Sequence, residues 1–128
     1  MRCDTETILE RAVRIWEASD FAYLDPVLSD QQPEAFELGY RIATDYATEF
    51  RDELISLLDS SNANVVAHSL DIIGRSGIVT HDAIPTQLMT DSRAVTIPGC
   101  IFREHSIGEL AGLCAANLKS LAGDPDRR

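Results

Sequence analysis

Two segments thirty residues apart share one pattern, and this repeat constrains the fold more than any other feature of the chain. Residues 27–44 (VLSDQQPEAFELGYRIAT) and 57–74 (LLDSSNANVVAHSLDIIG) each contain an aliphatic pair, a short polar break and an amphipathic helical pattern. A period in this range is typical of helical repeats, in which each helix pair buries its apolar face against the next pair. The spacing therefore predicts an all-α fold.

Length and composition are those of one globular domain. The chain has 128 residues, 45% of them hydrophobic, and a chain of this size removes roughly two thirds of its unfolded surface from water. We expect one domain over residues 1–122 and a frayed tail over 123–128. No apolar run approaches the ~20 residues that cross a bilayer, and acids occupy the place of a signal peptide's apolar core. A cytoplasmic protein is expected, and its three unevenly spaced cysteines fit reduced thiols.

The negative charge is concentrated in the first half of the chain. The net charge is −10, with fourteen acids and five bases in residues 1–60 against seven acids and six bases in residues 61–128. Such a surface repels phosphate backbones and anionic lipid, so the charge disfavours nucleic acid and membranes and favours a basic protein partner. An acidic surface also keeps proteins soluble, and composition alone does not separate these two interpretations.

Apolar residues recur at helical spacing along most of the chain and predict six to seven helices. The expected helices span residues 5–18, 21–28, 33–47, 49–59, 63–75, 82–91 and 106–121. Pro85 limits the sixth of these to a short helix. Residues 92–104 (SRAVTIPGCIFRE) break the thirty-residue register, and their β-branched residues around Pro98 and Gly99 indicate an extended or irregular segment.

The second repeat carries a family resemblance. The stretch LLDSSNANVVAHSLDIIGRSG has paired leucines, a small polar turn, a Val-Val opening, a small residue facing the neighbouring helix and a closing Ile-Gly. It resembles a HEAT-like repeat specifically over residues 55–75, more loosely over 21–47 and faintly afterwards. Ala63 and His68 depart from the family pattern, in which a proline and an arginine are common near these positions. The resemblance implies a short α-solenoid of HEAT-like helix pairs.

The repeat register also selects a candidate binding surface. Positions 34, 41 and 45 correspond to positions 64, 71 and 75, and in HEAT-like solenoids such side chains line the concave surface that commonly receives partners. The candidate partner-binding residues are Glu34, Glu37, Arg41, Asp45, Asn64, His68, Asp71 and Arg75. Glu37 with Arg41 and Asp71 with Arg75 have the spacing of ordinary solvated salt bridges, which is the alternative interpretation of this surface.

No motif in the sequence points to catalysis or to a cofactor. His81, Cys100, His105 and Cys114 are zinc-ligand types, but no CxxC or HxxxH pair brings two of them together, so no metal site is expected. Cys100 and His105 lack the third orienting group of a catalytic triad. Cys114 is expected in the core. Ser69 and Asn117 lie on apolar helix faces and are expected to be buried and hydrogen-bonded.

These features favour a protein-interaction module with an acidic surface. In general character the chain is similar to immunity proteins of bacterial toxin systems, which are commonly small, acidic and helical and fill the cationic clefts of nucleases. That similarity implies a toxin domain as the basic partner. Two alternatives stay open at this point: a small-ligand-binding or enzymatic domain that uses residues 77–105, and a structural subunit of a homo-oligomer.

Overall fold

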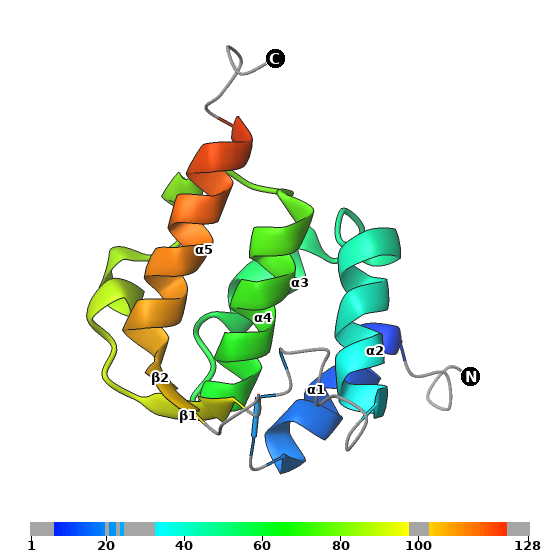
Figure 1. Ribbon diagram of the computed structural model, residues 1–128. Coiled ribbons are helices and arrows are strands. Elements are labelled where there is room, and N and C mark those ends of the chain that lie inside the picture. Colours follow the sequence, from blue (N-terminus) through cyan, green and yellow to red (C-terminus); the bar gives the residue numbers. More distant parts are fainter. Residues whose placement is uncertain (1–6, 20, 23, 25–32, 98–102, 123–128) are drawn as a thin grey trace.

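The computed structural model describes residues 7–19, 21, 22, 24, 33–97 and 103–122, and it is mostly helical with one small sheet (Figure 1). The helices are α1 (Ile8–Ala18), α2 (Pro33–Arg41), α3 (Arg51–Leu57), α4 (Ala63–Ser76) and α5 (Ile107–Ala122). A π-helical turn, η3 (Ile42–Tyr46), continues α2, and two 3₁₀ turns, η4 (His81–Ala83) and η5 (Thr86–Thr90), follow α4. Strands β1 (Ala94–Ile97) and β2 (Arg103–Ser106) precede α5.

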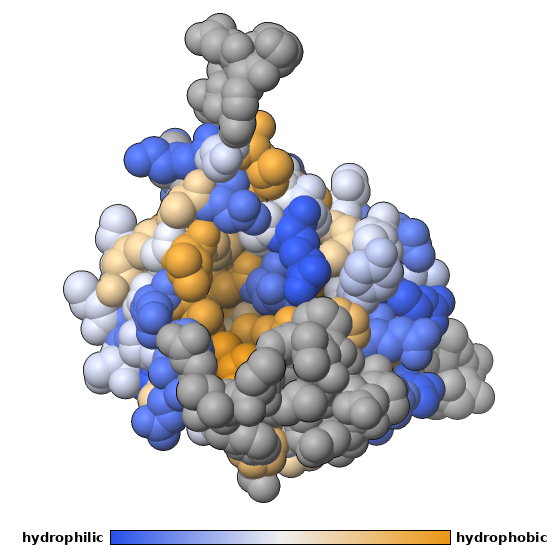
Figure 2. Space-filling model, in the orientation of Figure 1, coloured by the Kyte–Doolittle hydropathy of each residue, from blue (hydrophilic) through white to orange (hydrophobic). Residues whose placement is uncertain are grey.

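Helix α4 is the centre of the fold. Figure 1 shows α4 between α2 and α5, with α1 passing below α2 and α4 and with α3 behind α4; contacts link α4 to all four of these helices. Figure 2, in the same orientation, shows an apolar hollow in the molecular surface between α4 and α5. Residues 65–70 of α4 are all buried, as expected of a helix with neighbours on every side.

Local sequence explains where α1 begins and where α4 begins and ends. Thr7 and Glu10 form a capping box at the start of α1, so this helix begins at Ile8 rather than at residue 5. Asn62 caps α4 by accepting a hydrogen bond from the Val65 N–H at 3.2 Å. Gly77, with φ of 64°, ends α4 in the left-handed conformation that favours glycine. The predicted boundaries of α4 are therefore confirmed to within one residue.

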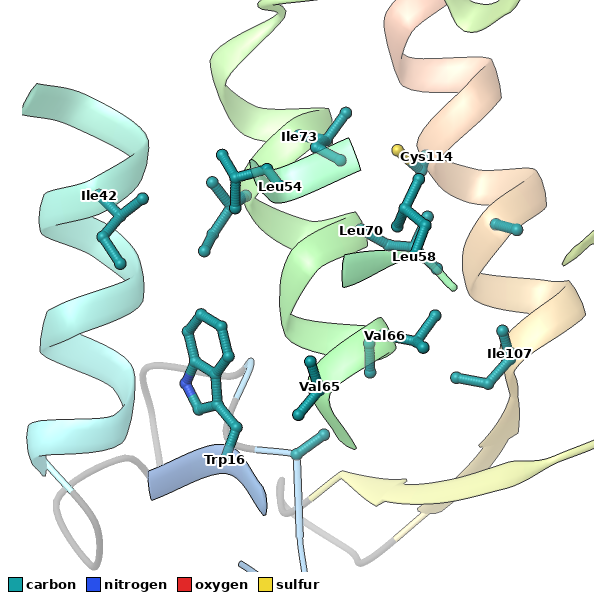
Figure 3. Packing of buried hydrophobic residues seen from close by; sticks show 14 of the residues in the cluster. Trp16, Ile42, Leu54, Leu58, Val65, Val66, Leu70, Ile73, Ile107 and Cys114 are labelled. Atoms are coloured by element: carbon teal, nitrogen blue, oxygen red, sulfur yellow. The ribbon is translucent and has the colours of Figure 1, made fainter. Parts of the chain in front are cut away.

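The core lies along the inner sides of the helices. Figure 3 shows Trp16 rising from α1 toward α4, with Ile42 of η3 on one side and Val65 of α4 on the other. Trp16 is fully buried, and its Nε1 lies 3.5 Å from the Ala35 carbonyl oxygen of α2, to which it donates a hydrogen bond. Ser69 is also buried, and its hydroxyl donates to the Val65 carbonyl at 2.8 Å as predicted.

The structure corrects the all-α prediction in the part of the chain between α4 and α5, where it has 3₁₀ turns and a two-stranded sheet. Within the described residues there are five α-helices, fewer than the six to seven expected, and the 82–91 helix is replaced by the two 3₁₀ turns on either side of Pro85. Strands β1 and β2 pair antiparallel, from Ala94 opposite Ser106 to Ile97 opposite Arg103. The β-branched residues predicted to be extended thus find strand partners within the 92–104 region.

Some predictions fall on parts of the chain that are not described. The 21–28 helix lies largely outside the described residues, and the Pro98–Gly99 turn and the 123–128 tail lie wholly outside them. Within the described part, no helix is both long enough and apolar enough to span a membrane.

Candidate functional site

The α2 part of the predicted binding surface is exposed to solvent. Glu34, Glu37 and Arg41 are exposed on α2, and Asp45 is exposed on η3. Glu34 accepts a hydrogen bond at 2.8 Å from Nε of Arg11, which links α2 to α1. The predicted Glu37–Arg41 salt bridge is not formed between these two described residues, and Glu34 pairs instead with Arg11 of α1.

On α4, the predicted Asp71–Arg75 salt bridge is confirmed. Nε of Arg75 donates to Oδ2 of Asp71 at 2.9 Å. Burial raises the pKa of the Asp71 carboxyl, while the hydrogen bond and the positive charge of Arg75 act against this rise. The Arg75 guanidinium also lies 6.0 Å from the centroid of the Phe36 ring on α2. The pair therefore lies between neighbouring helices rather than on an isolated surface.

His68 was expected on the outer face of α4, and this prediction is wrong. Its side chain is only 3% exposed and stacks on Trp16, with ring centroids 4.7 Å apart and an interplanar angle of 5°. Its buried Nε2 has no hydrogen-bond partner among the described residues. Burial lowers the pKa of His68 to about 3, because the charged imidazolium would have no solvation there. His68 belongs to the core because α1 covers this side of α4.

Asn64 is likewise not a free surface side chain. It is half-buried, and its Nδ2 donates to the carbonyl oxygen of Ser19 at 2.6 Å, just after the end of α1. The amide therefore fastens the start of α4 to the end of α1, and Asn64 keeps only part of its side chain exposed. Of the eight predicted site residues, His68 and Asn64 are structural, and the other six remain accessible to different degrees.

One surface groove contains Asp71 and Arg75. We name it the α4–α5 groove; it has a volume of about 300 Å³ and is the apolar hollow seen in Figure 2. Its lining residues are Leu24, Ala67, Leu70, Asp71, Gly74, Arg75, Leu110, Leu113, Cys114 and Asn117. Leu113 of α5 is 60% exposed at the edge of this groove.

The α5 wall of the groove carries two polar groups. Asn117 was expected to be buried but is exposed; its Nδ2 donates to the Gly74 carbonyl at 2.6 Å and so joins α5 to α4. Cys114 is buried as predicted. Burial, together with the negative charge of Asp71, raises the pKa of the Cys114 thiol to about 12. The thiol is therefore protonated at neutral pH and is a poor nucleophile.

A second groove lies between α1 and α3 and was not foreseen from the sequence. This α1–α3 groove has a volume of about 460 Å³. Its lining residues are Leu9, Glu10, Val13, Asp52, Glu53, Ser56 and Leu57. The apolar members come from the inward faces of both helices, and the three acids are exposed. The available signal was the acidic first turn of α3 next to the apolar stripe of α1.

The acids of the α1–α3 groove differ in how far they are already engaged. Glu10 accepts the capping hydrogen bond of the Thr7 N–H at 3.1 Å. Asp52 has an oxygen 3.6 Å from Nε of its neighbour Arg51, and both side chains are well exposed. No ion pair joins Glu53 to another described residue, so it is the carboxylate most available to an incoming cation.

In the described part of the region 77–105, proposed as an alternative site, Arg93 makes structural contacts. Arg93 donates through Nε and Nη2 to Asp91 at 2.8–3.1 Å and through Nη1 to the Ser60 carbonyl at 3.0 Å. These bonds hold the start of the hairpin against the turn between α3 and α4. Cys100 lies outside the described residues, and among those described no three His, Cys, Asp or Glu side chains gather as metal ligands.

Comparison with models of protein families, with curated proteins and with solved structures finds no match to this chain.

Proposed function

We propose that this protein is an interaction module that binds a basic protein partner through its acidic helical surface. The observation that carries the proposal is the α1–α3 groove, in which an apolar floor is bordered by exposed carboxylates. Apolar area supplies much of the affinity of an interface, while charges at its rim select the partner and speed association. A segment with a large apolar side chain flanked by lysine or arginine has the matching chemistry.

The distribution of charge supports the same partner class. Helices α1 and α3 both belong to residues 1–60, which hold fourteen of the 21 acids of the chain. A surface of this sign attracts cationic proteins over about one Debye length, roughly 8 Å at physiological salt. The exposed Glu34, Glu37 and Asp45 of the original candidate surface extend the acidic character onto α2 and η3.

We further propose that the helices form a short HEAT-like α-solenoid. Supporting this, α3 packs on α4 as one helix pair, and α2 contacts α4 where a preceding repeat would place its second helix. Under this proposal, the biological role is that of an immunity or inhibitor protein whose acidic surface blocks a basic toxin domain. The small size and the net charge of −10 support that role.

A pair of synthetic peptides tests the partner class. The first is an amphipathic helix with leucines on one face and lysines on the other, and the second has glutamates in place of the lysines. Fluorescence anisotropy should show that only the lysine peptide binds, and that its affinity falls as salt is raised from about 0.05 to 0.5 M. Equal binding of the two peptides, or binding of neither, would contradict the proposal.

Charge reversal then locates the contact. Glu53→Lys in the α1–α3 groove should weaken binding of the lysine peptide about tenfold or more, because it places a like charge at the rim. Glu104→Lys makes the same change in net charge at an exposed position of β2, outside the groove, and should have a small effect. Glu37→Lys reverses an exposed charge on α2, and its effect on peptide affinity shows whether α2 contributes to the contact. If Glu53→Lys and Glu104→Lys lowered the affinity for the lysine peptide equally, the attraction would be a general property of the acidic surface. The groove assignment would then be wrong.

A further inference from the structure

The α4–α5 groove presents charges of both signs beside an apolar surface. Arg75 uses its Nε for Asp71, and no hydrogen bond from its two Nη groups to another described residue is found. Asn117 uses its Nδ2 for the Gly74 carbonyl, which leaves its side-chain oxygen as a further acceptor. The groove therefore offers a guanidinium donor and a carboxylate acceptor one helical turn apart, with an amide oxygen on the opposite wall.

The apolar part of this groove is incompletely covered. Leu70 and Leu110 contribute to its lining, and Leu113 lies on its α5 side with 60% of its surface exposed. The volume of about 300 Å³ is at the lower end of the range for small-molecule sites, so it suits a ligand with one apolar side chain. Covering Leu113 would remove apolar surface from water and so favour such a ligand.

We propose that the α4–α5 groove binds an apolar α-amino acid as its zwitterion. The ligand ammonium group would pair with Asp71, its carboxylate with the Nη groups of Arg75, and its side chain would cover the exposed leucine of α5. This site is separate from the α1–α3 groove and does not depend on the proposed function.

Net charge decides for a zwitterion over a simple anion or cation. The Asp71–Arg75 pair is neutral as a whole, and a net charge of −10 on the chain opposes a lone anion. A lone cation would satisfy Asp71 but would be repelled by Arg75. A ligand with both charges can pair with Asp71 and with Arg75. Burial destabilises the Asp71 carboxylate and so raises its pKa, and a bound ammonium group would stabilise the carboxylate again.

The groove fits binding rather than chemistry. The one nucleophile type in its lining, the Cys114 thiol, has its pKa raised to about 12 and so stays protonated. No further step beyond association is therefore assigned to this site.

Three compounds with the same apolar group test the proposal: L-phenylalanine, phenethylamine, which lacks the carboxylate, and 3-phenylpropionate, which lacks the ammonium. Isothermal titration calorimetry on the full chain should show phenylalanine binding at least about tenfold tighter than either analogue, because each analogue loses a hydrogen-bonded charge pair. An analogue that binds as tightly as phenylalanine, or no binding of phenylalanine at millimolar concentration, would overturn the proposal.

Two exposed leucines of α5 provide a matched pair of variants. Leu113, 60% exposed, lines the groove, and Leu121, 61% exposed, does not. Leu113→Ser should weaken phenylalanine binding several-fold, and Leu121→Ser should leave it unchanged; both residues are exposed enough for the fold to persist. Arg75→Gln should remove the preference for phenylalanine over phenethylamine. Equal effects of the two leucine variants, or an unchanged preference in Arg75→Gln, would refute the assignment, whatever the lysine peptide does at the α1–α3 groove.

Discussion

The buried His68 makes a quantitative prediction about acid stability. In the folded protein its pKa is lowered to about 3 from an ordinary 6.5, because the stack on Trp16 excludes water from the imidazole. Between pH 3 and pH 6.5 the unfolded chain therefore binds a proton at His68, whereas the folded protein does not. By linkage, the contribution of His68 to stability is complete above pH 6.5 and is lost as the pH falls toward 3.

The size of the loss follows from the two pKa values. At pH 5 the unfolded imidazole is almost fully protonated and the folded one is neutral, so the free energy of unfolding is lower than at pH 7.5 by about 2 kcal/mol. The limit at very low pH is about 5 kcal/mol. Because pH 5 lies well above the folded pKa, the first figure depends almost entirely on the ordinary pKa of histidine. A loss of this size is a large part of the stability of a small domain.

Urea unfolding of the wild-type protein and of His68→Phe, at pH 7.5 and pH 5, measures this loss. Phenylalanine retains an aromatic ring to stack on Trp16 but has no proton to gain. We expect the wild type to lose about 2 kcal/mol more than the variant between the two pH values, since all other titrating groups cancel in the comparison. His68→Leu repeats the test without the ring. If wild type and both variants lost the same free energy, His68 would not be buried in the neutral form, and the core as described would be wrong.

Three further predictions concern backbone and thiol chemistry. In urea unfolding, Gly108→Ala should destabilise the fold by about 2 kcal/mol or more, because a Cβ there would lie 2.6 Å from the Met89 carbonyl oxygen. Gly112→Ala, in the same helix, is the control: a Cβ there would have no atom within 4 Å, so the variant should be more stable by up to about 1 kcal/mol. Asn62→Ala should cost about 1 kcal/mol in urea unfolding through loss of the α4 cap. The Cys114 thiol should resist labelling by iodoacetamide at pH 8 until the protein is unfolded, as followed by peptide mass spectrometry, because burial raises its pKa to about 12.

Sequence periodicity predicted what depends on local pattern. It predicted α4 almost to its ends, because Asn62 and Gly77 mark the boundaries chemically. It also predicted the helix over residues 5–18, of which α1 forms Ile8–Ala18. It could not place His68, since a helical wheel distinguishes the faces of one helix but does not say that α1 covers the polar-looking face of α4.

The two grooves lay beyond sequence reasoning for a related physical reason. Each groove is the space left where two helices do not close, as where Leu113 stays exposed beside α4. Helix separation depends on the side chains of both partners and on residues that hold them together, such as Asn117 on the Gly74 carbonyl. The exposed acids of α1 and α3 were visible in the sequence, but their position around one apolar floor depends on the packing of two helices distant in sequence.

Asp71 and His68, three residues apart on α4, should respond to acid in opposite directions. Burial raises the pKa of Asp71, so the folded protein holds a proton there more strongly than the unfolded chain does. Protonation of Asp71 therefore favours the folded state as the pH falls through that raised pKa, whereas protonation of His68 in the unfolded chain opposes it. Asp71→Asn removes the first effect and keeps the second, so the variant should lose more stability than the wild type in urea unfolding as the pH is lowered from 7 toward the ordinary aspartate pKa of 3.8. A shallower loss in Asp71→Asn would mean that the charge of Arg75 outweighs burial and that the α4–α5 groove already satisfies its carboxylate, which would remove the reason for an ammonium group to bind there.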